Sequence, residues 1–229
     1  MGFDLIELTW DSNFFGRKIG KIEISDCENI KFVEEAIADS NFETIYIFNN
    51  LSENRTESLC SSRSIFMDRK LILIKNSLAR KNICDSIQVL SNRNDEDLLT
   101  LCLLSGHLSR FKKDSLLNHK FKDMYEKWLS NCFDKGMVLG YYEKNKLCGF
   151  VGIVHNRCDV SIELIAVSEN SQKKGVGSKL LDAVEYFGAK DLRTKIVVAT
   201  QFENISAVNL YEKNNYIKHQ CIDIYHYHK

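Results

Sequence analysis

The stretch Ile162–Leu181, with the sequence IELIAVSENSQKKGVGSKLL, decides how the rest of the chain is interpreted. Its apolar start predicts a buried strand that ends at Val167. A polar turn follows, and an amphipathic helix is predicted to begin close to Gly175. A strand, a glycine-containing turn and a helix in this order can present backbone N–H groups to an anion.

The turn itself, Gln172–Gly177, has the sequence QKKGVG and suits a diphosphate group. The first N–H groups of a helix lack partners within it, and the helix dipole places about half a positive charge there. Gly175 and Gly177 carry no side chains that would keep a diphosphate away. Lys173 and Lys174 add positive charge. The alternative is a solvated basic helix start with two incidental glycines. The turn lacks the GKS or GKT of a Walker loop and the GxGxxG of a Rossmann fold.

The first 80 residues predict a small α/β domain. Alternation or short apolar runs indicate strands at Ile19–Ile24, Thr44–Phe48 and Arg69–Lys75. Apolar residues at helical spacing indicate a helix at Asn29–Asp39. We expect residues 1–80 to contribute to binding of the acceptor substrate.

Residues 81–229 predict a second, larger domain. The expected order is strand, two helices, three strands, helix, strand, helix and a last strand region. The corresponding ranges are Ser86–Leu90, Asp95–Leu104, Phe121–Phe133, Met137–Tyr142, Leu147–His155, Val160–Val167, Gly175–Ala189, Lys195–Thr200, Ser206–Lys213 and Tyr216–Tyr227. The polar segment Glu143–Lys146 predicts a hairpin turn between two of these strands. The fold class is therefore α/β, of the α+β kind.

Composition excludes several classes of function. The 229 residues contain 31 Lys and Arg against 31 Asp and Glu, so the chain has no excess charge for a nucleic acid or a polybasic membrane contact. No apolar run approaches the roughly 20 residues that span a bilayer. The opening MGFDLIELTW does not match a signal peptide. The eight cysteines show no CxxC pair, so we expect no metal site and a cytoplasmic protein with free thiols.

Three segments together resemble the GNAT superfamily of N-acetyltransferases: IELIAV, QKKGVG, and AVNLYEKNNY after the strand KIVVATQ. The resemblance implies a mixed, mostly antiparallel central sheet flanked by helices, with acetyl-CoA as co-substrate. It also implies that Ser161–Val167 and Lys195–Thr200 splay apart around the coenzyme. The coenzyme-binding residues that it implies are Ile165, Ala166, Val167, Gln172, Lys173, Lys174, Gly175, Val176, Gly177, Ser178, Asn204 and Asn209.

A narrower resemblance points to the acceptor. The segments LTWDSNFFGRKIGKI, SRFKKD and VATQFENISAVNLYEKNNY look like the TDP-fucosamine acetyltransferase family. That family acetylates the 4-amino group of a dTDP-4-amino-4,6-dideoxyhexose for surface-polysaccharide (O-antigen) synthesis, and it implies a possible homodimer. The substrate-binding residues expected from it are Trp10, Phe14, Phe15, Arg110 and Lys112. Aromatic residues near a strand are more often core than ligand contacts, and a solvated basic loop is the more frequent explanation for the basic residues.

The reaction requires an acid, a base and an oxyanion donor. By resemblance, Tyr211 is the general acid near the coenzyme sulfur, with a packing tyrosine as the alternative. Glu163 is a candidate base or an ordinary surface carboxylate, and His155 is a second candidate base. A backbone N–H at Ala166 or Val167, aimed by a β-bulge, would hold the oxyanion. No Cys–His setting is recognisable, so we expect direct attack by the amine on the thioester.

Two smaller interpretations concern the last predicted helix. Asn204 would cap its start, and that side chain or Asn209 could contact the pantetheine arm. Asn214 and Asn215 stand where a glycine is common in the family, and asparagine can adopt the positive φ expected there. Three functions remain open: the nucleotide-sugar N-acetyltransferase, a GNAT enzyme acting on another amine or a protein N-terminus, and a non-catalytic acyl-CoA-binding module.

Overall fold

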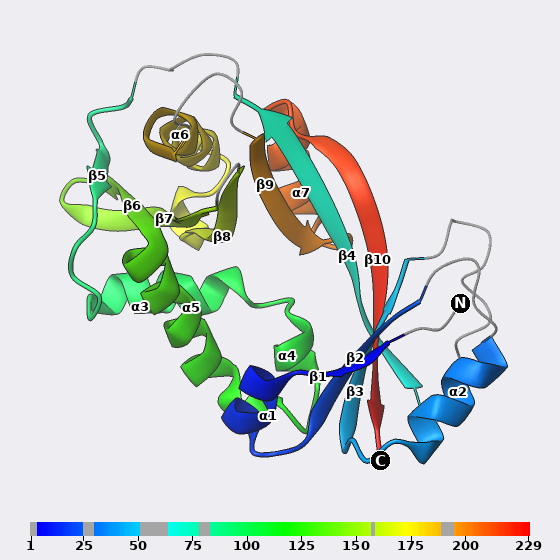
Figure 1. The fold of residues 1–229 in the computed structure, drawn as a ribbon. Helices are drawn as coiled ribbons and strands as arrows, with labels where there is room; N and C mark the ends of the chain where they lie inside the picture. The colour runs from blue at the N-terminus through cyan, green and yellow to red at the C-terminus, as the bar shows by residue number, and fades with distance from the viewer. Residues whose placement is uncertain (1–3, 25–29, 51–63, 78–82, 157–158, 189–194) are drawn as a thin grey trace. The chain divides into compact units, whose positions relative to one another are not determined.

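A computed structural model describes residues 4–24, 30–50, 64–77, 83–156, 159–188 and 195–229 (Figure 1). The chain divides into two compact units. The first contains Met1–Leu71, Gln201–Glu203 and Cys221–Lys229, and the second contains Ile72–Thr200 and Asn204–Gln220. Two long strands, β4 (Ser64–Asn76) and β10 (Ile217–His228), contribute residues to both units.

The expected division between residues 80 and 81 differs from these compact units in three places, one of which is the short segment Gln201–Glu203 in the first unit. Residues 72–80 fall in the second unit's range, and the C-terminal residues Cys221–Lys229 return to the first. The return follows from strand pairing, because Asp223–His228 pair with Asn49–Thr44. Contacts between distant strands, rather than order along the chain, decide which residues share a core. The functional division into an acceptor domain and a catalytic domain stays a prediction.

The first unit is built around a β-α-β arrangement. Its elements are β1 (Leu5–Glu7), α1 (Thr9–Phe15), β2 (Ile19–Ile24), α2 (Ile30–Asp39) and β3 (Thr44–Asn49). Strands β2 and β3 are parallel, β1 is antiparallel to β2, and β10 is antiparallel to β3. A parallel pair requires a crossover, which α2 provides. Apolar side chains from these elements, from the segment between α2 and β3 and from β10 form the core of the unit: Ile22, Ile24, Val33, Ile37, Phe42, Ile45, Ile47, Tyr225 and Tyr227.

The second unit is a mixed sheet with the strand order β4-β9-β8-β7-β6-β5. Its strands and helices are β5 (Ile87–Val89), α3 (Glu96–Ser105), α4 (Arg110–Lys113), α5 (Phe121–Lys135), β6 (Gly136–Glu143), β7 (Lys146–His155), β8 (Asp159–Val167), α6 (Val176–Ala183), β9 (Lys195–Gln201) and α7 (Ile205–Lys213). Strands β5 to β8 are antiparallel neighbours, and β9 runs parallel to β8. The predicted GNAT architecture is confirmed.

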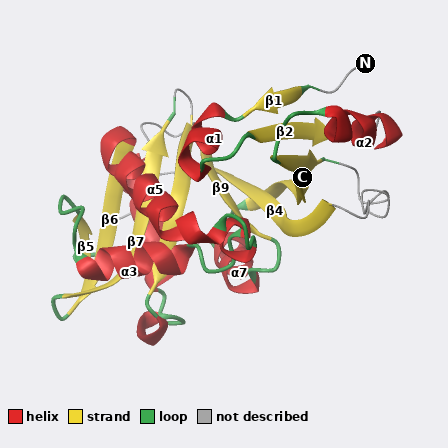
Figure 2. Cartoon of the chain, turned by 90° about the horizontal axis from the view of Figure 1, so that it is seen from below, coloured by secondary structure: helices red, strands yellow, loops and turns green. Residues whose placement is uncertain are grey.

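Helices cover both faces of this sheet. A Cβ at Gly152 of β7 would lie 2.8 Å from the Cys132 sulfur of α5, whereas a Cβ at Gly149 would lie 3.2 Å from Val176 of α6. Positions 149 and 152 point to opposite faces of a strand, so α5 and α6 lie on opposite sides. Figure 2 shows α3 and α5 crossing the strands β6 and β7. All residues from Leu147 to Val154 are buried, as a strand covered on both faces requires.

Local signals placed several element ends correctly. Asp95 caps α3 by accepting from the Leu98 N–H at 2.9 Å. Lys144 and Asn145 have φ of 50° and 62°, the left-handed geometry of a tight hairpin turn between β6 and β7. Asn215 has φ of 64°, as expected of an asparagine that replaces glycine after a helix.

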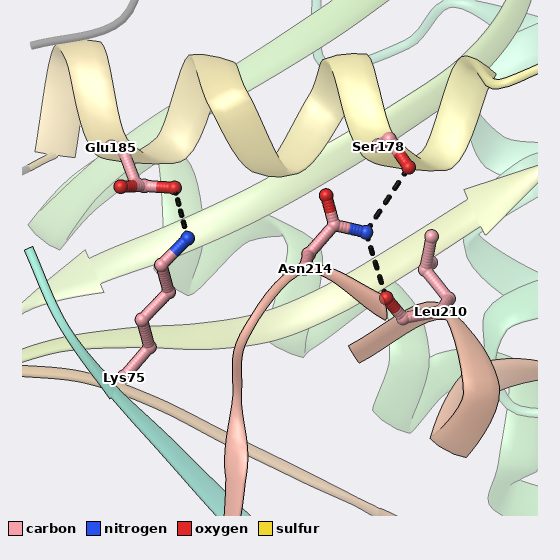
Figure 3. A network of polar contacts seen from close by, with 5 residues as sticks. All are labelled: Lys75, Ser178, Glu185, Leu210 and Asn214. Carbon is pink, nitrogen blue, oxygen red and sulfur yellow. Dashed lines mark hydrogen bonds and ion pairs between the residues drawn. The ribbon is translucent and has the colours of Figure 1, made fainter. Parts of the chain in front are cut away.

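The helix after the glycine-rich turn is shorter than predicted. We expected one helix over Gly175–Ala189, but α6 ends at Ala183 and a π-helical turn follows over Val184–Gly188; Ala189 lies outside the described residues. Glu185 in this turn is 2% exposed, and its carboxylate accepts from Lys75 Nζ of β4 at 2.5 Å (Figure 3). A buried carboxylate needs such a partner, because isolated burial of a charge is costly.

None of the described helices combines the length and the apolar character that crossing a membrane would require.

We predict that Lys75→Met lowers the free energy of unfolding by about 3–5 kcal/mol, because Glu185 is left buried without its cation. The double substitution Lys75→Met, Glu185→Leu should recover most of this loss, because it removes both charges. Urea denaturation measures both effects. Arg93→Met, which breaks the exposed Arg93–Asp134 pair, is the control and should cost less than about 1 kcal/mol. A double variant as unstable as the single one would contradict this account.

Candidate active site

The candidate site is the region where the parallel strands β8 and β9 stop pairing. Their ladder runs from Asp159 and Lys195 to Ile162 and Val198. Strand β8 continues to Val167 and β9 to Gln201, but no pairing between them is recorded there. The resemblance predicted a splay between these strands, and the pairing pattern agrees with it.

A β-bulge lies at the point of separation. Ile153 pairs with Ile162 and Gly152 pairs with Leu164, so Glu163 is the extra residue on β8. A bulge bends its strand and increases its twist, which gives a physical reason for β8 to leave β9 there. We expected a bulge at Ala166 or Val167. That expectation is wrong, because these residues pair regularly with Phe150 and Gly149.

The register of β7 and β8 determines which backbone groups face the opening. The Ser168 N–H donates to the Cys148 carbonyl at 2.8 Å. Antiparallel bonds alternate, so Ala166 is also bonded to β7, whereas the N–H and C=O groups of Ile165 and Val167 point away from β7. The Val167 carbonyl accepts from Gln172 Nε2 at 3.1 Å, in agreement with this direction. Ile165 and Val167, rather than Ala166, therefore offer backbone groups to a ligand.

The turn after β8 leads into the N-terminus of α6. Lys173 and Gly175 adopt left-handed φ values of 59° and 82°. The first bond within α6 joins the Lys179 N–H to the Gly175 carbonyl at 3.1 Å. No side chain caps this helix. The N–H groups of Val176, Gly177 and Ser178 precede that first bond, as the diphosphate hypothesis requires.

The two glycines of this turn have different roles. Gly175 has open space around a Cβ, so its left-handed φ is what favours glycine. A Cβ at Gly177 would lie 2.9 Å from Cδ2 of Leu210 on α7. Gly177 thus permits close packing of α6 on α7, which is a second role besides the one that the sequence suggested.

Tyr211 follows Leu210 on α7 and lies in the core of the second unit. It is 2% exposed, and its ring centroid lies 5.5 Å from that of Tyr216. Burial raises the pKa of the Tyr211 phenol above its ordinary value. The neutral phenol is therefore retained over the physiological pH range. A neutral phenol carries the proton that an acid must donate, and its raised pKa makes it a weaker acid than a free tyrosine.

The two candidate bases lie in different places. Glu163 is exposed and occupies the bulge. Burial is the main cause that raises the pKa of the Cys132 thiol to about 12, and the negative charge of Glu163 is the second cause. His155 pairs with Val160, on the far side of the bulge from the opening. Val160 and Ile165 are about 16 Å apart along an extended strand, so His155 is not part of this site.

The other predicted coenzyme residues lie on α7. Asn204 caps the helix, and its Oδ1 accepts from the Ala207 N–H at 3.2 Å. Asn209 is exposed. The cap is confirmed, whereas contact of either side chain with the coenzyme stays a prediction.

The predicted acceptor residues form separate groups. Trp10 and Phe14 lie on α1, a helix that the sequence did not predict, and their rings stack at 4.8 Å with an interplanar angle of 11°. Trp10 is 51% exposed, whereas Phe15 is buried and belongs to the core. On α4, the Arg110 guanidinium lies over the Phe111 ring, and Lys112 is exposed with its Nζ 5.6 Å from the centroid of Phe121.

Sequence reasoning missed Asn214 as a site residue. It is 9% exposed, and its Nδ2 donates to Ser178 Oγ and to the Leu210 carbonyl (Figure 3). The only signal in the sequence was the departure from glycine after the tyrosine-containing helix. From the sequence, that departure indicates only a positive φ at the Asn214–Asn215 pair and no side-chain contact.

We predict that Gly175→Ala lowers the free energy of unfolding by about 1–2 kcal/mol, because an L-residue is strained at φ of 82°. Gly175→Asn should cost less, since asparagine tolerates this conformation better than alanine. Chemical denaturation measures both values. Equal stability of the alanine variant and the wild type would contradict the argument.

Comparison with known proteins agrees with this geometry. The sequence model of the acetyltransferase (GNAT) family matches residues 106–216, which contain the bulge, the turn and Tyr211. No curated protein sequence matches the chain.

Solved structures share the fold at low identity. A putative GNAT acetyltransferase from Novosphingobium aromaticivorans has a TM-score of 0.55 and 12% identity, covering 86% of this chain and 80% of its own. A functionally unknown protein from Staphylococcus epidermidis has a TM-score of 0.62 and 16% identity, covering 93% and 84%. A GNAT acetyltransferase from Colwellia psychrerythraea has a TM-score of 0.52 and 12% identity, covering 99% and 100%.

Residues 106–216 match the GNAT acetyltransferase family and the chain has the GNAT fold, and these findings support an acetyl-CoA-dependent N-acetyltransferase activity.

Proposed function

We propose that the chain transfers the acetyl group of acetyl-CoA to the amine of a nucleotide-linked amino sugar of the dTDP-4-amino-4,6-dideoxyhexose type, in the cytoplasm. The observation that carries the acceptor is the stacked pair of Trp10 and Phe14 on α1 of the first unit. Trp10 is 51% exposed, and a pair of stacked aromatic rings at the surface suits stacking against a flat or ring-shaped ligand. The same residues carry the narrower family resemblance in the sequence.

In this proposal, backbone groups make most of the contacts with the coenzyme. The N–H groups of Val176, Gly177 and Ser178 would hold the diphosphate, with Lys173 and Lys174 exposed beside them. The outward-facing groups of Ile165 and Val167 would bond the pantetheine arm as a substitute for the missing strand partner.

Direct transfer follows from these residues. The neutral amine forms a C–N bond to the thioester carbonyl, and an outward N–H of Ile165 or Val167 stabilises the oxyanion. Glu163 accepts a proton from the attacking nitrogen, directly or through water. When the C–S bond breaks, Tyr211 donates its proton to the departing thiolate and later regains one from solvent. The arrangement needs no metal and no covalent acyl-enzyme.

We predict that Tyr211→Phe lowers kcat about 100-fold or more, while the Kd for CoA changes less than about twofold. The substitution removes only the phenolic hydroxyl and keeps the ring against Tyr216. Because burial holds the pKa of Tyr211 above its ordinary value of about 10, wild-type kcat should show no loss from Tyr211 ionisation below about pH 10.

Steady-state kinetics and calorimetry measure these quantities. Tyr186→Phe is the matched control, since Tyr186 is 40% exposed and lies outside the proposed site. Unchanged turnover in Tyr211→Phe would remove this tyrosine from the mechanism.

The acceptor is tested by incubating the protein with acetyl-CoA and a panel of dTDP- and UDP-linked amino sugars, polyamines, aminoglycosides and peptides. Release of free thiol is followed. We expect turnover with a dTDP-4-amino sugar. Turnover only with other amines would reject the sugar, and CoA binding without any thiol release would indicate a non-catalytic module.

The aromatic pair is tested with the accepted sugar. Trp10→Ala should raise the KM for the sugar about tenfold and leave the KM for acetyl-CoA unchanged, because base or sugar stacking is worth about 1–3 kcal/mol. Phe32→Ala is the control, since Phe32 is an exposed aromatic residue on α2 of the same unit. If Trp10→Ala and Phe32→Ala changed the KM for the sugar equally, the aromatic pair would have no specific role in binding the acceptor.

A further inference from the structure

The first turn of α6 and the last turn of α7 are in direct contact. Gly177 lies against Leu210 so closely that a Cβ on the glycine would touch the leucine side chain at 2.9 Å. Leu210 is the residue before the proposed acid, Tyr211. The proposed diphosphate-binding turn and the helix that carries the acid are therefore neighbours at this point.

A single buried amide connects these two turns. Asn214 Nδ2 donates one hydrogen bond to the Leu210 carbonyl at 2.7 Å and another to Ser178 Oγ at 3.0 Å (Figure 3). Leu210 offers only an acceptor here, which fixes the orientation of the amide. Asn214 is 9% exposed, so water competes little for either bond.

The backbone around Asn214 holds α7 at the same place. Its own N–H donates to the carbonyls of Leu210 and Tyr211, at 3.2 and 3.0 Å. After the left-handed Asn215, the Tyr216 N–H returns to the Tyr211 carbonyl at 3.0 Å. The carbonyls of Leu210, Tyr211 and Glu212 at the end of α7 thus all accept hydrogen bonds, and the side chain of Asn214 adds a polar link to α6.

We propose that Asn214 is a positioning residue that fixes the diphosphate-binding N-terminus of α6 relative to the acid-bearing end of α7. It acts through Ser178, whose N–H is one of the three that precede the first bond within α6. The inference rests on the proposed mode of coenzyme binding and does not depend on the identity of the acceptor. Asn214 is not a catalytic residue, because its amide is used within the protein.

The test measures the Kd for CoA by calorimetry, together with the melting temperature. Asn214→Leu, which has a similar volume but no donors, should weaken CoA binding about tenfold, as expected for the loss of hydrogen bonds at a binding turn. Asn214→Ala should weaken it similarly, and this variant carries the test if the leucine variant does not fold. Lys213→Gln, at the exposed neighbouring position, should bind CoA like the wild type.

A double-substitution cycle tests whether Asn214 acts through Ser178. With Ser178→Ala already present, Asn214→Leu should weaken CoA binding less than about threefold, because the link is already broken. A full tenfold loss in that background would overturn the proposal. It would also be overturned if Asn214→Leu lowered the melting temperature but bound CoA with wild-type affinity, since that is the result of a purely structural role.

The two failures are distinguishable. A wild-type protein that does not bind CoA would overturn the proposed coenzyme site and the positioning role with it. A wild-type protein that binds CoA, with asparagine variants that bind it equally well, would overturn the positioning role alone.

Discussion

The site depends on the early end of the ladder between β8 and β9. Backbone N–H and C=O groups that leave a ladder must be satisfied by another partner. The bulge at Glu163 turns β8 away from β9 while its other edge stays bonded to β7. Strand β7 is covered on both faces, so the open edge of β8 is held in a rigid frame. A row of fixed backbone groups results, and a ligand with amide groups of its own can take the place of the missing strand.

The second constraint is the close approach of α6 and α7. It requires glycine at position 177 and is reinforced by the buried amide of Asn214. One end of this contact is a helix N-terminus with no capping side chain, and the other carries Tyr211. The proposed anion-binding turn and the proposed proton donor are therefore on adjoining turns. Small shifts of either helix would change the separation between the two chemical functions.

Burial controls the electrostatics behind this contact. Tyr211 and Tyr216 are both buried, and burial raises the pKa of each phenol. The Lys75 ammonium, paired with Glu185, lies 5.5 Å from the centroid of the Tyr216 ring. The charges are neutralised within the pair, so Tyr216 lies beside a polar but compensated interior. Burial thus keeps both phenols neutral over the physiological pH range.

The local sequence determined the positions of most strands and helices. Period-2 and period-3.6 patterns located β2, β3, β6 to β9, α3, α5 and α7 to within a few residues, because they depend only on which side chains face a core. Asp95 as a helix cap and the left-handed Asn215 were likewise foreseeable from neighbouring residues. The glycine-rich turn follows from these local signals, whereas the GNAT fold was implied by the family resemblance of three segments.

Only the tertiary structure decided the features that depend on residues far apart in the chain. The bulge at Glu163 is a register between two strands, the function of Gly177 depends on Leu210, and Lys75 finds its partner at Glu185. The C-terminal strand joins β3 rather than forming part of a separate C-terminal domain. A sequence pattern records which face of an element is buried, but the identity of the neighbour on that face arises only when the chain folds.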